Sequence, residues 1–234
     1  MGFSSPCENT TCSSTRSIAA VTPDAVAYVS KHRAASGQDS LTVHPIGNWG
    51  AAEFGGRSGD VVASAPGLMT DALRRVAAGA RESAYPVTFE ATHHGPFLET
   101  PTFYIEVGTS AEAYADARAA RILAAAVLAA SDPGDPVALG VGGGHYVPRI
   151  TDVALARRVS FGHLMPSYAL EPANYAAIER AIDRTPDAKF VYFHRKAIRK
   201  PTLRELESFF RDRGLEPVRE ADLAALPGAP PEKV

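Results

Sequence analysis

Short apolar runs typical of strands alternate along this chain with stretches of helical periodicity. Six runs indicate strands, at residues 25–30, 41–44, 87–92, 102–107, 137–141 and 189–194. Helical patterns occupy residues 66–81, 109–131, 152–158, 172–183 and 202–213. Strands separated by helices favour a parallel or mixed sheet with helices packed on its faces. The sequence therefore predicts an α/β sandwich built on a mixed or mostly parallel sheet flanked by helices.

The chain has the size and composition of one globular domain. Its 234 residues are 45% hydrophobic and 21% charged, which is ordinary for a protein with a substantial core. We expect a poorly ordered leader at residues 1–22, one catalytic α/β domain at 23–226 and a flexible tail at 227–234. No stretch approaches the ~20 apolar residues that cross a bilayer, so we expect a cytoplasmic protein without membrane contact.

One predicted helix carries a clear start signal. Residues 109–112, Thr-Ser-Ala-Glu, have the form of a capping box. They predict the longest helix of the chain, which ends near Ser131. Its inner face should be a stripe that packs on the sheet, formed by Ala113, Ala117, Ala120, Ala124, Val127 and Leu128.

Two adjacent histidines stand where the strand at 87–92 gives way to a loop. His93 and His94 follow Thr92, and Gly95-Pro96 then stops the strand. Neighbouring side chains on an extended chain point to opposite faces, so one imidazole can face a cleft while the other is held by hydrogen bonds. This pattern indicates a catalytic or metal-binding site.

Histidines recur where apolar runs end. A lone histidine is usually structural, but several that share one cleft indicate a functional site. In open α/β sheets, ligands bind beyond the carboxyl ends of the strands, which is where these residues fall. The candidates are His32, His44, His93, His94, His145 and His163.

Two acids lie near the histidine pair. If the strand at 102–107 pairs with the strand at 87–92, Glu106 stands beside His93 or His94, as a metal ligand or as the group that fixes the imidazole tautomer. Glu99, in the loop between the strands, is a candidate general base. The alternative for each is a solvated or helix-capping acid.

A glycine run follows the apolar run at 137–141. Gly142, Gly143 and Gly144 precede His145 and match neither the dinucleotide fingerprint nor a P-loop. Their backbone could approach a ligand closely and offer amides to an oxyanion or a phosphate, although a tight structural turn is nearly as good an explanation. No Gly-x-Ser-x-Gly elbow occurs, and both cysteines lie in the leader, which leaves activated water as the nucleophile.

A basic strip spans residues 188–204, with six cations and no acid. Such a strip on a mildly acidic protein suits a phosphate-bearing partner. A solvated charge run near a helix start explains it about as well.

These motifs resemble the archaeal and plant type of D-aminoacyl-tRNA deacylase. The resemblance covers most of residues 25–170. Its matching pieces are Ser30-Lys31-His32-Arg33 with Ser36-Gly37, Leu41-Thr42-Val43-His44 with Gly47-Asn48, Thr92–Pro101 with Glu106-Val107-Gly108, Gly140–Tyr146, and Gly162-His163-Leu164-Met165-Pro166. It implies hydrolysis of the ester between a D-amino acid and the 3′ adenosine of tRNA, in a monomeric, zinc-associated enzyme of phosphorylase/hydrolase-like fold.

The predicted site combines the residue patterns with this resemblance. The predicted catalytic residues are His93, His94, Glu99 and His145. The predicted metal ligands are His93, His94 and Glu106. The residues predicted to contact D-aminoacyl-tRNA are Lys31, His32, His44, Gly142, Gly143, Gly144, His163, Lys196, Arg199 and Lys200. Two alternatives stay open: a metal-assisted hydrolase of another ester or amide, such as a peptidyl-tRNA hydrolase or peptidase, and a tRNA-binding module without catalysis.

Overall fold

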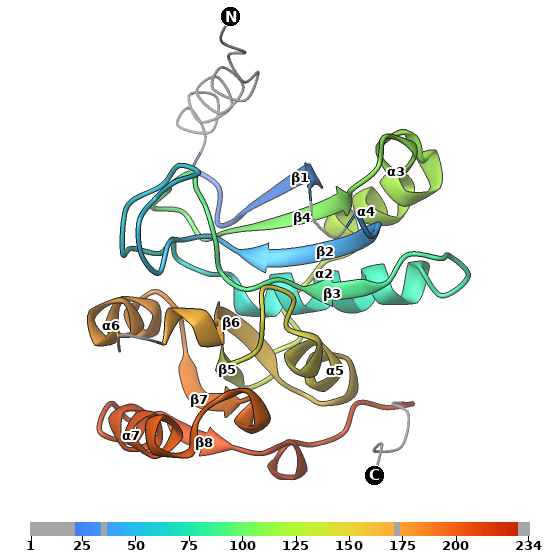
Figure 1. Cartoon of the computed structure of the whole chain (residues 1–234). Coiled ribbons are helices and arrows are strands. Elements are labelled where there is room, and N and C mark those ends of the chain that lie inside the picture. Colours follow the sequence, from blue (N-terminus) through green and yellow to red (C-terminus); the bar gives the residue numbers. More distant parts are fainter. Residues whose placement is uncertain (1–21, 34–36, 171–173, 229–234) are drawn as a thin grey trace, which may run out of the picture.

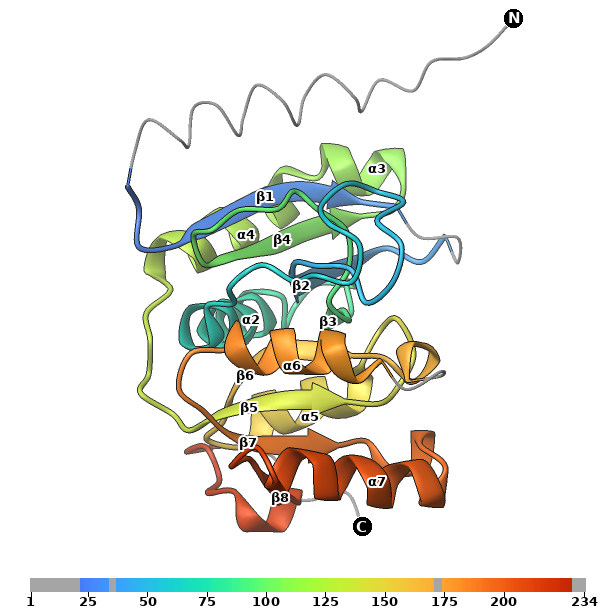
Figure 2. The same cartoon turned by 90° about the vertical axis from the view of Figure 1, so that its left-hand side faces the viewer.

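The computed structural model describes residues 22–33, 37–170 and 174–228 (Figure 1), so most of the predicted leader and tail lie outside it. Two four-stranded sheets make up the framework. The first sheet has the order β1-β4-β2-β3 and the second the order β6-β5-β7-β8. Figure 2 shows the two sheets one above the other, with α2 (Pro66–Gly79) at the level between them.

The first sheet is mixed. It comprises β1 (Val26–His32), β2 (Ser40–Pro45), β3 (Val87–Phe89) and β4 (Thr102–Gly108). β1 pairs with β4 in parallel, β2 pairs with β4 antiparallel, and β3 pairs with β2 in parallel. The expected pairing of the strand at 102–107 with the strand at 87–92 is therefore wrong, because β2 lies between them.

The second sheet is entirely parallel. It comprises β5 (Val137–Val141), β6 (Ser160–Met165), β7 (Ala188–Phe193) and β8 (Glu216–Val218). The strand patterns at 137–141 and 189–194 correspond to β5 and β7, whereas β6 and β8 were not anticipated. The mixed and the parallel sheet, both with helices packed against them, confirm the predicted α/β class.

Helices cover both faces of the second sheet. α6 (Tyr175–Asp183) and α7 (Lys200–Arg211) share one apolar core with β5 and β7. α5 (Pro148–Ala156) and α2 contribute to the other core, which also receives side chains of the first sheet. The hydroxyl of Thr70 on α2 accepts a hydrogen bond from the Phe161 amide of β6, at 2.9 Å. Side chains of both sheets therefore belong to one apolar core, which includes α2.

The predicted helix at 109–131 is two helices, α3 (Ala111–Ala115) and α4 (Ala117–Ala129). The pattern at 109–112 correctly predicted a helix start, but the cap of α3 is Ser110 and not Thr109. The Asp116 carboxylate then accepts a hydrogen bond from the Arg118 amide and starts a new helix. This restart changes the helical phase, so the predicted inner stripe is wrong at Ala117, Ala120, Ala124 and Leu128, which are exposed, and holds at Ala113 and in part at Val127. The residues that α4 buries are Ala119, Leu123 and Ala126.

Side-chain alternation divides the first sheet into two unlike faces. Along β4, Phe103, Ile105 and Val107 join the core formed with α2 and α4, while Tyr104 and Glu106 point to the opposite face. Loop residues of the described chain lie over that opposite face. Tyr104 packs there against Ile46 and Val62, with Phe97 and Leu98 beside them.

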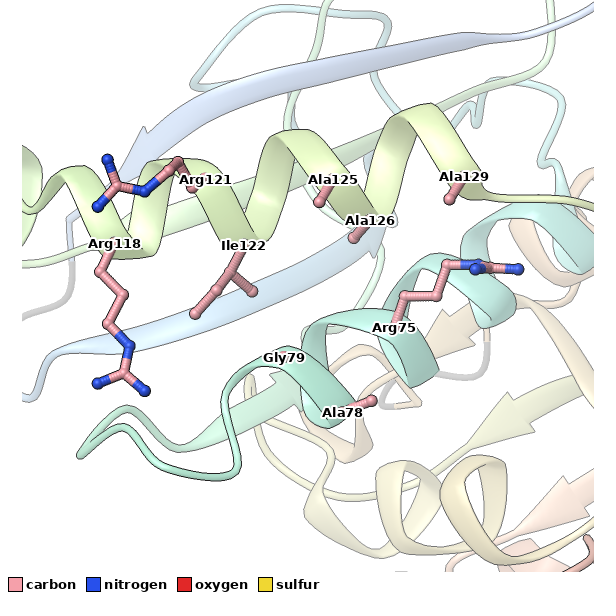
Figure 3. A pocket seen from close by; sticks show the side chains of 9 residues that line it. All are labelled: Arg75, Ala78, Gly79, Arg118, Arg121, Ile122, Ala125, Ala126 and Ala129. Atoms are coloured by element: carbon pink, nitrogen blue, oxygen red, sulfur yellow. The ribbon is translucent and has the colours of Figure 1, made fainter.

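A groove of about 480 Å³ runs between α2 and α4, on the helix-covered side of the first sheet (Figure 3). Small side chains and Ile122 line it, together with Arg75, Arg118 and Arg121. Arg75 pairs with Asp71 at 2.7 Å and Arg118 with Glu82 at 3.7 Å. No helix within the described ranges is long and apolar enough to cross a membrane.

Candidate active site

The polar face of the first sheet brings three predicted site residues together. Glu106 pairs in register with Ser30 of β1 and Thr42 of β2, and His32 and His44 lie two residues further along those strands, on the same face. The distance from Glu106 Oε2 is 3.8 Å to His32 Nδ1 and 3.6 Å to His44 Nε2. β1 and β2 run in opposite directions, so His32, His44 and Glu106 lie across the face of the sheet and not along one of its edges.

Glu90 is the centre of the arrangement, and the sequence reasoning missed it. It follows β3 directly and its side chain is fully buried. Its carboxylate oxygens lie 3.3 Å from His32 Nδ1, 3.3 Å from His145 Nε2 and 3.5 Å from His93 Nε2. The available signal was an acid inside an otherwise apolar run, three residues before His93.

Seven side chains thus form one His/Glu cluster: His32, His44, Glu90, His93, His94, Glu106 and His145. The ring centres of His44 and His93 are 4.1 Å apart, and those of His93 and His94 4.5 Å. The sequence expectation that histidines from separate segments converge is confirmed for His32, His44, His93, His94 and His145.

Backbone carbonyls fix the tautomer of three of these imidazoles. The Nδ1 atoms of His44, His93 and His94 lie within hydrogen-bond distance of the carbonyl oxygens of Pro45, Ala91 and Gly95, respectively. A carbonyl only accepts hydrogen bonds, so each Nδ1 must donate. In a neutral ring, Nε2 then carries the lone pair, which is the form that binds metals.

Several polar atoms at the centre of the cluster make no hydrogen bond to the described part of the chain, although charged or polar groups of the cluster lie near them. Within the described residues, both oxygens of Glu90 and the Nε2 of His44 are buried and make no hydrogen bond. An unsatisfied buried polar group costs about 1–3 kcal/mol, and a charged one more. The Glu90 oxygens and the Nε2 lone pairs are all hydrogen-bond acceptors. Acceptors that face one another need a proton or a cation between them, so these residues fit a bound metal ion.

Three overlapping groups have ligand atoms within 4.8 Å of one another. They are His44, His93 and His94; Glu90, His93 and His145; and His32, Glu90 and Glu106. The shared residues His93 and Glu90 join the three groups into one continuous site. These buried groups could hold a metal ion by their geometry.

Burial and mutual charge set the protonation states. Burial, with a smaller contribution from His44, lowers the pKa of His94 to about 4, and the pKa of His93 falls well below its ordinary value for the same reasons. Burial opposes ionisation of Glu90, but its contacts with His145, His44 and His32 outweigh this and lower its pKa. Neutral His93 and His94 therefore lie beside an ionised Glu90 near pH 7. For His44, burial opposes protonation, but the contacts with Glu106 outweigh burial and raise the pKa.

Tyrosines form part of the wall of the cluster. The hydroxyl of Tyr146 lies 2.8 Å from His32 Nε2. The ring of Tyr104 stacks on His44, with centres 5.2 Å apart, and on Tyr28, with centres 4.8 Å apart. Tyr28 and Tyr104 therefore pack beside His44, and Tyr146 contacts His32.

Glu99 takes no part in the contacts that join the cluster. Its side chain is 72% exposed and pairs with Arg184 at 3.0 Å and with Arg57 at 3.9 Å. Its environment is that of the solvated acid considered as the alternative. Lys31 alternates with His32 on β1, and its ammonium lies 5.3 Å from the centre of the Tyr114 ring, away from the polar face.

His163 lies inside β6 and is fully buried. Its Nδ1 is 3.2 Å from the hydroxyl of Thr92, the residue before His93, and Trp49 packs against its ring. Burial lowers its pKa to about 3. His163 therefore supports the segment that carries the histidine pair and does not itself line the cluster.

The glycine turn serves mainly as a structural element. Gly142 and Gly143 have φ values of 100° and 104°, which favour glycine. The Gly142 amide donates to the Met165 carbonyl and the Gly143 amide to the Ser167 hydroxyl, at 2.8 and 2.9 Å. The amides of Gly142 and Gly143, two of the three predicted oxyanion donors, are thus already hydrogen-bonded within the protein. The turn also positions His145 next to Glu90.

The basic strip does not form a single surface. Arg195 pairs with Glu207. Lys196 lines a hollow beside β7, and Arg199 lines another next to the start of α7. Lys200 is the first residue of α7 and is exposed. Among the described residues, none of these cations contacts the His/Glu cluster.

Comparisons with known proteins identify relatives. The model of the family described as D-aminoacyl-tRNA deacylase matches residues 19–218. A protein of Methanosarcina mazei named D-aminoacyl-tRNA deacylase is 36% identical over 202 residues, which are 85% of this chain and 68% of that protein. A protein of the same name from Methanococcoides burtonii is 34% identical over 88% of this chain, which spans only 43% of its length.

The fold also matches a solved structure. A crystal structure described as a conserved protein of unknown function superimposes with a TM-score of 0.83 and 26% sequence identity. The match covers 89% of this chain and 76% of the other. The resemblance drawn from the sequence motifs is confirmed.

Proposed function

The chain belongs to the D-aminoacyl-tRNA deacylase family, and we propose that the His/Glu cluster is its active site. Membership supports hydrolysis of the ester between a D-amino acid and tRNA, which makes the protein a hydrolase. One observation carries the proposed site: the buried Glu90 carboxylate, without hydrogen-bond partners among the described residues, faces three imidazoles.

The Nε2 atoms of His44, His93 and His94 would hold the metal of this site, which we propose to be zinc. Three neutral imidazoles are a known ligand set of catalytic zinc, which keeps a further position open. When bound, the ion supplies a Lewis acid that polarises the ester carbonyl. Glu106, predicted from sequence as a ligand, lies 3.6 Å from that same Nε2 of His44, so its carboxylate would add negative charge next to the ion.

Glu90 acts as the general base. Its lowered pKa keeps it ionised at neutral pH, so it can take a proton from the attacking water. His145 Nε2, 3.3 Å away, receives that proton and passes it to the ribose oxygen as the ester bond breaks. The side chain of His145 is 38% exposed, which suits the group that meets the leaving alcohol. Glu99 is the weaker candidate for the base because it is solvated and paired with arginines.

The substrate enters from the open side of the cluster. Lys196, Arg199 and Lys200 contact tRNA phosphates, which fix its position but read little sequence. L-aminoacyl esters are rejected sterically, at the pocket wall near the α-carbon. The cytoplasmic location and the monomeric state stay predictions of the sequence.

A matched pair of substrates tests this function. Deacylation of D-tyrosyl-tRNA and of L-tyrosyl-tRNA should be measured with and without a chelator, and again after zinc is restored. We expect hydrolysis of the D-ester only, its loss with the chelator and its recovery with zinc. Equal turnover of both esters would contradict the chiral selectivity, and full activity in a chain shown to be metal-free would contradict the metal.

A further inference from the structure

A second polar hollow lies at the carboxyl ends of β7 and β8. It has a volume of about 650 Å³ and includes the last residues of both strands, Phe193 and Val218, in its lining. Four cations and one carboxylate also line it: Arg149, Arg195, Lys196, Arg219 and Glu220. In parallel α/β sheets this edge is where ligands commonly bind.

The hollow keeps a net positive charge once its ion pairs are counted. Glu220 is paired with both Arg149 and Arg157, so its charge is more than offset. No acid among the described residues pairs with the side chain of Lys196 or of Arg219. Two cations are therefore available to an anionic ligand, beside a guanidinium that is already held in place.

His194 stands on the wall between this hollow and the glycine turn. Its Nδ1 is buried and lacks a hydrogen-bond partner within the described part of the chain. A Cβ atom on Gly143 would lie 3.5 Å from that nitrogen. Burial and the charges of Arg149 and Lys196 lower the pKa of His194, which shows that the positive potential of the hollow reaches the ring.

The hollow is close to the His/Glu cluster along the chain. His145 contacts Glu90 in the cluster, and Arg149, four residues later, lines the hollow. Four residues span at most ~14 Å even when fully extended. One short segment therefore contributes to both sites.

We infer that this hollow binds a phosphate group of the tRNA acceptor strand while the esterified 3′ end occupies the His/Glu cluster. The inference rests on the proposed function and adds Arg149 and Arg219 to the tRNA contacts. Guanidinium groups match phosphate with two parallel hydrogen bonds, and Lys196 adds a point charge. This site is a formed hollow, in contrast to the exposed start of α7.

Two substrates separate phosphate binding from chemistry. Kinetics should be compared for D-tyrosyl-tRNA and for the D-tyrosyl ester of adenosine, which has no phosphate. In the double variant K196A/R219A, the ratio of kcat/KM for tRNA to kcat/KM for the adenosine ester should fall at least tenfold. The slope of log KM against log salt should decrease by about 0.7 for each cation removed, as for single-stranded nucleic acid. Arg121→Ala, an exposed arginine between α2 and α4, is the matched control and should leave the ratio unchanged.

Inorganic phosphate distinguishes the sources of the phosphate group. It should inhibit hydrolysis of the tRNA ester more than that of the adenosine ester, and K196A/R219A should weaken this inhibition. An equal loss on both substrates, or an unchanged ratio, would overturn the inference. Phosphate binding in the hollow without any effect on the ratio would assign it to a free phosphate monoester and also overturn it. A wild-type chain that hydrolyses neither ester would instead refute the proposed function.

Discussion

The two faces of the first sheet come from the same four strands and differ in almost every physical respect. On β4, Phe103, Ile105 and Val107 enter the apolar core under α2 and α4. Tyr104 and Glu106, which alternate with them, lie under loops among imidazoles and carboxylates. The helix-covered face stabilises the fold by burying apolar area, whereas the polar face buries acceptors that are costly without a cation.

The second sheet is a useful contrast because helices cover both of its faces. Its strands have apolar neighbours on each side. The candidate site lies instead on the face of the first sheet that loops cover. We expect stability and catalysis to divide between the two faces of the first sheet in this way.

The largest effect should come from Glu90 on the polar side. Glu90→Gln keeps the size of the side chain but removes the proton acceptor, so we expect kcat to fall about 10²–10⁴-fold, the usual contribution of a general base. Glu99→Gln is the matched control and should retain nearly full activity. Steady-state deacylation of D-tyrosyl-tRNA gives both values, and circular dichroism checks the fold. Equal activity of the two variants would remove Glu90 from the mechanism.

Leu41, on the apolar face of β2, should affect stability instead. Its side chain is fully buried in the shared core, and Leu→Ala in such a site costs about 2–5 kcal/mol of unfolding free energy. Urea denaturation measures this cost. The folded fraction of Leu41→Ala should keep its kcat, and a loss of kcat comparable with that of Glu90→Gln would break the division between the faces.

His163 should make stability depend on pH. Its pKa in the folded chain is about 3, below the ~6.5 of an unfolded histidine. The unfolded state therefore takes up the proton first as pH falls, and the stability present above pH ~6.5 decreases toward pH ~3. The slope from this residue approaches ~1.4 kcal/mol per pH unit. In urea titrations from pH 7 to pH 4, His163→Asn should lack this component, and identical slopes in the two proteins would contradict the assignment.

The smallest effect should come from Asp116, which starts α4 on the apolar side. Asp116→Ala removes the cap of the Arg118 amide, and such a loss typically costs about 1 kcal/mol. Thermal unfolding measures it. Asp116→Asn, which keeps a capping oxygen, should recover most of the loss, and deacylation should be unaffected in both. A destabilisation shared equally by the two variants would point to the Tyr85 hydroxyl contact instead of the cap.

Local sequence patterns predicted the local features of this molecule. The helix start near residue 110 and the α/β class could be read from neighbouring residues. The histidine pair His93–His94 could be picked out in the same way, and its role stays a prediction. The order β1-β4-β2-β3 could not be read in this way, because it depends on which strands meet far apart along the chain. For that reason Glu106 was assigned to the wrong neighbour, and His32 and His44 are its actual contacts.

Glu90 was missed for a related reason. In the sequence it looks like one more residue of an alternating strand, and only the convergence of His32, His93 and His145 around it gives it a role. The inner face of α4 was missed because one aspartate restarts the helix. For Glu90 the deciding contacts are distant along the chain, whereas for α4 the deciding contact is local but was hidden inside one continuous helical pattern.

The most direct test of the division between the two faces is the rate of D-tyrosyl-tRNA hydrolysis along β4. Phe103→Leu, Tyr104→Leu, Ile105→Val and Glu106→Gln should be measured at a temperature where all four chains are folded. We expect a loss of kcat that alternates with the side chains, large at positions 104 and 106 and slight at 103 and 105. Losses of similar size at all four positions would contradict this expectation.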